Sequence, residues 1–183
     1  MRRFKDRTSG SSAEKQRGAF TLIEVLIVVV ILGIIATVVV PQFSNASFEA
    51  RENTLKDDLR YIRIQMQVYK AQHEDRAPGY PNGVTTSTPT EAAFVDQMTR
   101  YSNEIGVTAA VGSNSYKFGP YLTKVPENPI NGKTAIKMIP NGTAMPAPDA
   151  SESYGWIYKA ETQEFICNLT GNDSTGKTPY SRY

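Results

Sequence analysis

The chain has 183 residues, of which 40% are hydrophobic and 21% are charged. This length and composition fit one globular domain with an appendage, and they exclude wholesale disorder and a membrane protein with many spans. The chain has one cysteine and one histidine. It therefore has no internal disulfide framework and no zinc site of the Cys₄ or Cys₂His₂ type.

The formal net charge of +2 is unevenly distributed. Residues 1–19 hold six basic and two acidic side chains, a net charge of +4. The other residues hold 14 basic and 16 acidic side chains, a net charge of −2. A body with this charge has no broad basic surface, so we expect no nucleic-acid partner.

Residues 20–40 form an apolar run in which Glu24 is the one charged residue. At ~1.5 Å per helical residue the run spans ~30 Å, which is enough to cross the core of a bilayer. The basic residues before it predict that the N-terminus stays in the cytoplasm. A secretory signal has a shorter apolar run of ~7–15 residues and then a small-residue cleavage site. Here a second helical pattern follows instead.

That second pattern is amphipathic, with apolar residues at steps of four, three, four and three. They are Leu55, Leu59, Ile62, Met66 and Tyr69. The two patterns together predict one long helix from about residue 20 to about residue 73, with a kink at Pro41. Its first half is apolar, and its second half needs a small domain to cover the stripe.

Glu24 is the most informative residue of the apolar run. A carboxylate inside a membrane-spanning helix costs about 2.5–3.5 kcal/mol on insertion scales. A cationic partner would offset this, and the amino terminus of a neighbouring subunit is one if the chain is cut just before Phe20. The alternative is a glutamate solvated by lipid head groups.

The remaining sequence predicts a loop and a short helix over 77–118, a sheet over 119–169 and a flexible tail over 170–183. The short helix lies near residues 89–104, behind a capping box of Thr88 and Glu91. Strands are expected at 134–139, 156–159 and 164–168, the last two as a hairpin. The fold class is α+β: a long helix packed on a small antiparallel sheet.

The sequence from Gly18 to Glu24, the apolar run and Pro41 together resemble the class III signal and N-terminal helix of the type IV pilin and pseudopilin superfamily. The resemblance implies that a prepilin peptidase cuts between Ala19 and Phe20 and methylates the new amino group. Glu24 then becomes the fifth mature residue and Pro41 the twenty-second, as in the family. The family usually has glycine directly before the cut, whereas Gly18 lies one residue further back.

The sequence GPYLTKVP at 119–126, with Asn128-Pro129 and Gly155-Trp156 after it, resembles the major pseudopilins of type II secretion systems. The resemblance implies three parts: a leader over 1–19, a membrane or filament-core helix over 20–43, and a periplasmic pilin-like domain over 44–183 that begins with helix 44–73. Such a subunit crosses the bacterial inner membrane once. It then joins copies of itself and other pseudopilins on an inner-membrane assembly platform, in a filament that helps to export proteins.

Major pseudopilins often hold calcium, which prefers six to eight oxygen ligands. The candidate ligands are Asp149, Glu152 and Asp173, whose spacing matches no known calcium loop, so they also fit solvated loop carboxylates. Residues 171–178 match the phosphate-binding pattern GxxxxGK[ST]. That loop works at the start of a helix, for which the five following residues leave no room, so we expect no nucleotide.

Two other interpretations remain open. One is a type IV pilin for adhesion, motility or DNA uptake, which shares the N-terminal chemistry. The other is an uncleaved, membrane-anchored periplasmic binding module. An enzyme is not expected, because no nucleophile–base set or carboxylate pair has an informative spacing.

Overall fold

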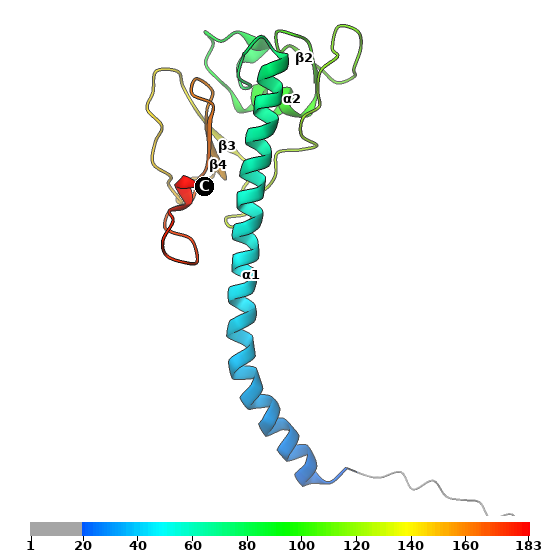
Figure 1. Cartoon of the computed structure of the whole chain (residues 1–183), viewed down its shortest axis with the longest axis vertical. Coiled ribbons are helices and arrows are strands. Elements are labelled where there is room, and N and C mark those ends of the chain that lie inside the picture. The colour runs from blue at the N-terminus through cyan, green and yellow to red at the C-terminus, as the bar shows by residue number, and fades with distance from the viewer. Residues whose placement is uncertain (1–19) are drawn as a thin grey trace, which may run out of the picture. The chain divides into compact units, whose positions relative to one another are not determined.

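A computed structural model describes residues 20–183 of the chain (Figure 1). Its first element, α1, is a single helix of 51 residues, Leu22–Gln72. The chain forms two compact units, one that ends at Ser44 and one that comprises Asn45–Tyr183. The long helix predicted from the sequence is confirmed, and Pro41 lies inside it.

The second unit adds short elements to the C-terminal half of α1. Its helices are η1 (Pro81–Gly83), α2 (Glu91–Thr99) and η2 (Tyr180–Arg182). Its strands are β1 (Tyr101–Ser102), β2 (Thr108–Ala109), β3 (Ile136–Ile139), β4 (Trp156–Lys159) and β5 (Glu164–Cys167). Strands β1 and β2 form a small hairpin, and β3, β4 and β5 form a sheet in that order. The α+β fold class is therefore confirmed.

The three-stranded sheet is mixed rather than purely antiparallel. Strands β4 and β5 form the predicted antiparallel hairpin, with Trp156 opposite Cys167. Strand β3 runs parallel to β4, with Ile136 opposite Trp156. The physical reason is the connection over residues 140–155, because a crossover of a dozen or more residues can return the chain in the same direction.

The helix α2 begins later and ends earlier than the sequence predicts. Thr90, not Thr88, is the N-cap, and its hydroxyl oxygen accepts a hydrogen bond of 3.2 Å from the amide of Ala93. Glu91 does not complete a capping box. Its Oε1 accepts a hydrogen bond of 2.9 Å from the amide of Ile136, so it ties α2 to β3 instead.

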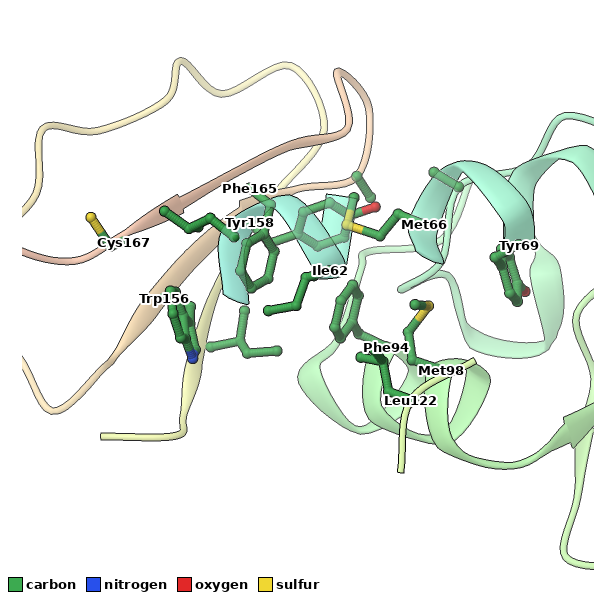
Figure 2. Close-up of a cluster of buried hydrophobic side chains, with 14 of the residues drawn as sticks. Ile62, Met66, Tyr69, Phe94, Met98, Leu122, Trp156, Tyr158, Phe165 and Cys167 are labelled. Carbon is green, nitrogen blue, oxygen red and sulfur yellow. The ribbon is translucent and has the colours of Figure 1, made fainter. Parts of the chain in front are cut away.

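The core of the second unit lies between α1, α2 and the sheet. All five predicted stripe residues of α1 are at most 1% exposed. Figure 2 shows Ile62 and Met66 of α1 beside Phe94 of α2, with Tyr158 and Phe165 of the sheet on the other side. Phe94 and Tyr158 bring their ring centroids to 4.9 Å, so aromatic contacts join α2 to the sheet.

The C-terminal tail is part of this packed unit, and the predicted flexible tail over 170–183 is wrong. Tyr180 is 5% exposed and belongs to the core cluster. The Sγ–H of Cys167 donates to the carbonyl oxygen of Tyr180. Sequence reasoning missed this because the Gly, Ser and Thr residues of 170–178 are typical of solvated loops.

Two isoleucines two positions apart on α1 test the assignment of its faces. Ile62 is fully buried and Ile64 is 52% exposed. We expect Ile62→Ala to lower the free energy of unfolding by about 2–5 kcal/mol, because it removes buried methyl groups and leaves a cavity. Ile64→Ala should change it by less than about 0.5 kcal/mol. Thermal unfolding of the full chain in detergent measures both, and equal losses would contradict the assignment.

Candidate functional site

The N-terminal end of α1 is organised by Thr21 and Glu24. The amide of Glu24 donates to Thr21 Oγ1 at 3.2 Å, and the amide of Thr21 donates to Glu24 Oε2 at 3.4 Å. This reciprocal pair is a capping box, which satisfies amide groups that the first helical turn leaves free. The carboxylate of Glu24 is thereby directed toward the segment that precedes the helix, where Phe20 lies.

The helix that follows this cap is unusually apolar and unusually exposed. Every described residue from Phe20 to Val40 is exposed. By length and composition, α1 is the one helix of residues 20–183 that could cross a membrane. Water is a poor solvent for a side-chain run of this kind, so a lipid phase or other helices must cover it.

The predicted processing residues are only partly within the structure. Gly18 and Ala19 lie outside the described residues, so cleavage between Ala19 and Phe20 stays a prediction. Phe20 is 80% exposed. Sequence reasoning missed Thr21, although threonine three residues before a glutamate and directly ahead of an apolar run is the sequence signature of a capping box.

A second group of residues holds the C-terminal tail against α1. Glu52 is 3% exposed, and its carboxylate accepts three hydrogen bonds from the tail. The donors are the amide and hydroxyl of Ser174, at 2.7 and 2.6 Å, and the hydroxyl of Tyr180, at 2.6 Å. Burial alone would raise the pKa of Glu52, but these hydrogen bonds outweigh it and the pKa lies below its usual value.

Arg63, which lies further along α1 than Glu52, makes the second attachment of the tail. Its guanidinium donates to the carbonyl oxygen of Phe165 at 2.7 and 3.1 Å and to the main-chain oxygen of Tyr183. Lys56 lies 4.5 Å from the ring centroid of Tyr183, a cation–π distance. Glu52, Lys56 and Arg63 thus fix the tail on the helix, and no pattern in the sequence pointed to them.

The three candidate calcium ligands occupy separate roles. Asp149 accepts the amide and hydroxyl of Ser151, which lower its pKa. Glu152 forms an ion pair with Lys137 at 2.5 Å. Asp173 accepts the hydroxyl of Thr175 at 2.6 Å. Within residues 20–183 no group of three or more histidine, cysteine, aspartate or glutamate side chains could hold a metal ion, so these three carboxylates are not brought together.

The segment that matches a phosphate-binding loop is folded around carboxylates. The amides of Lys177 and Thr178 donate to Asp173 Oδ1 at 3.2 and 3.3 Å, and the amide of Ser174 donates to Glu52. A phosphate-binding loop would offer such amides to the ligand. Here they are bonded to acidic side chains, and this geometry disfavours an anion.

A hollow of about 800 Å³ lies beside η1 and the turn between β4 and β5. Its acidic side chains form ion pairs. Glu74 lies 2.7 Å from Arg76, and Glu161 lies 3.1 Å from Lys159. The thiol of Cys167 is fully buried, and burial raises its pKa to about 11, so it is a poor nucleophile. These groups hold the fold together rather than forming a reactive set.

Comparison with known families agrees with the geometry of the N-terminal end. Residues 15–40 match the family described as the prokaryotic N-terminal methylation motif. This motif, the long helix and the α+β body together are similar to those of the type IV pilin and pseudopilin superfamily.

Within that superfamily, the chain is similar to proteins named type II secretion system core protein G. It is 43% identical to the Pseudomonas aeruginosa protein over 56 residues, which is 31% of this chain and 39% of that protein. It is 28% identical to those of Aeromonas hydrophila and Klebsiella pneumoniae over 116 residues, which is 63% of this chain and 69% and 70% of theirs. No solved structure is significantly similar to this chain.

The attachment of the tail through Glu52 is directly testable. We expect Glu52→Gln to lower the free energy of unfolding by about 1.5–3 kcal/mol, because a charge-assisted acceptor is lost. The exposed Glu49 is the matched control, and Glu49→Gln should change it by less than about 0.5 kcal/mol. Denaturant unfolding of the full chain in detergent measures both variants.

The wild type and Glu52→Gln should also differ in how their stability depends on pH. The pKa of Glu52 is lower in the folded chain than in the unfolded one, where it is about 4.3. Its contribution to stability is therefore present above about pH 4.3 and is lost as the pH falls through the folded pKa. The stability difference between the wild type and Glu52→Gln should be constant from pH 7 to 5 and shrink below pH 4.3. A difference that persists at low pH would contradict the role of this carboxylate.

Proposed function

We propose that the chain is a structural subunit of a type II secretion pseudopilus, a periplasmic filament that helps to export proteins. The single observation that carries this proposal is the exposed apolar segment from Phe20 to Val40, with Glu24 in the first turn of its helix. The names of its relatives support the assignment to type II secretion. The role is structural rather than enzymatic.

The proposed subunit passes through two environments. It first lies in the bacterial inner membrane as a single-pass protein, with its N-terminus in the cytoplasm and the unit Asn45–Tyr183 in the periplasm. Prepilin peptidase cuts before Phe20 and methylates the new amino group. An inner-membrane assembly platform then transfers the subunit to a filament that contains copies of this chain and other pseudopilins.

Cohesion of this filament comes mainly from the apolar helices. Packed side by side, they cover one another, and the surface that lipid covered before assembly does not meet water. Glu24 sets the register between neighbouring subunits, because a carboxylate in this apolar environment is stabilised only beside a positive charge. The amino group of Phe20 on the next subunit supplies that charge.

The capping box gives Glu24 a position near the chain's own amino terminus before assembly. In the free subunit the Glu24 carboxylate is bonded to the amide of Thr21, one residue from the new amino terminus. The chain's own amino group can therefore neutralise Glu24 before assembly. On assembly the neighbour's amino group takes over this role, so the carboxylate has a partner at both stages.

Two other functions would share parts of this structure. A type IV pilin would use the same helix and the same N-terminal chemistry. An uncleaved binding module would keep its leader and would need no partner for Glu24. The similarity to core protein G favours the pseudopilus over both.

A substitution at Glu24 tests the proposal. In the native host, Glu24→Gln should reduce the filament fraction by about tenfold or more, as expected for a loss of ~1.4 kcal/mol in subunit contact. The amount of subunit in the membrane should not change. Glu49→Gln is the control and should assemble normally. Filaments are measured by shearing the cells and quantifying the sedimented subunit. Normal assembly of Glu24→Gln would contradict the proposal.

A further inference from the structure

The solvent-facing side of α1 in the second unit has an ordered charge pattern. Lys56, Arg60 and Arg63 recur at steps of four and three residues, so they share one edge of the helix. Asp57 lies ~100° around the helix from Lys56, and Asp58 a further ~100°. The exposed side of this segment therefore has a basic edge and an acidic edge.

An apolar row follows the acidic edge along the helix. Asp57 is followed at steps of four, three and four by Tyr61, Ile64 and Val68. These three side chains are 49%, 52% and 38% exposed. They point away from the stripe that packs on the sheet. A row with this spacing is of the kind that another helix covers.

The basic edge borders a groove of about 580 Å³. Besides the three basic residues, the groove is lined by Ile64, Met66, Gln67, Gln163 and Tyr183. Its lining therefore contains no acidic side chain. Arg63 and Lys56 have contacts with the tail, but Arg60 is exposed and forms no ion pair among residues 20–183.

The acidic edge lacks partners in the same way. Neither Asp57 nor Asp58 forms an ion pair within the described chain. Partial burial and the neighbouring charge of Asp57 raise the pKa of Asp58. Two acids and one arginine, none of which forms an ion pair within residues 20–183, are complementary in charge.

We propose that this groove receives the acidic edge of a second copy of the chain, so that Asp57 of one copy meets Arg60 of the next. The contact also covers the row of Tyr61, Ile64 and Val68. It rests on the proposed function, since it is a contact between filament subunits. Asp57 and Arg60 are three positions apart on α1, so each copy offers an acid to one neighbour and a base to the other. A contact of this type continues into an open filament rather than closing a dimer.

Complementary charge-reversed chains test this contact. Arg60→Glu places an acid where the base of the proposed pair was, and Asp57→Lys places a base where its acid was. Each variant alone should lose about tenfold or more of its sheared, sedimentable filament. The two variants expressed together with different epitope tags should regain most of it. A purely internal effect of Asp57 on Arg60 of the same helix is not repaired by mixing.

Cross-linking gives a second measurement on chains with smaller changes. One tagged chain has Asp57→Cys and the other has Arg60→Cys, and a short bis-maleimide reagent is added to sheared filaments. The native Cys167 is fully buried, with its thiol pKa raised by burial, so it contributes little background. We expect a cross-link between the two differently tagged chains.

Wild-type filaments distinguish a failure of the proposed function from a failure of the subunit contact. If wild-type filaments are absent, the proposed function fails, and the subunit contact fails with it. Wild-type filaments can also be present while the contact fails. This is shown if the single variants assemble normally, if the mixture regains no filament, or if the cross-link is missing. The contact is then wrong and the proposed function stands. Thermal unfolding of each variant in detergent should match the wild type, which shows that lost assembly is not lost folding.

Discussion

The whole arrangement depends on one constraint, which is that the apolar half of α1 has no partner among residues 20–183. Every described residue from Phe20 to Val40 is exposed. Such a surface is stable in a bilayer or among like helices and is unfavourable in water. The capping box of Thr21 and Glu24 keeps the first helical turn satisfied while leaving a carboxylate at the same end. Both proposed environments of the subunit, membrane and filament, follow from this surface.

The second unit meets a different requirement, because it must remain folded while the helix changes surroundings. Its core stripe on α1 is fully covered by α2 and the sheet (Figure 2). The tail then closes the structure through Glu52 and Arg63, which bind main-chain and side-chain groups more than 100 residues away. These attachments use Glu52 and Arg63, so Asp57, Asp58 and Arg60, which form no ion pair within residues 20–183, remain available for contacts with other subunits.

Much of this was readable in the sequence, and the failures have physical causes. The spacing of apolar residues fixed both faces of α1, and the hairpin of β4 and β5 was evident from its strands. The direction of β3 was not, because strand patterns do not encode whether a connection crosses over. The tail was misjudged because its order comes from one buried carboxylate, Glu52, whose partners lie far away in sequence. Thr21 was overlooked although its capping signature was present.

The central claim is that the chain is processed and assembled rather than retained as a simple anchor. The most direct measurement is the N-terminus of the protein isolated from its native host, by peptide mass spectrometry. The account predicts a chain that starts at Phe20 and carries a methyl group on its amino nitrogen. A chain that keeps its residues before Phe20, with no methylated phenylalanine, would contradict the account and remove the partner proposed for Glu24.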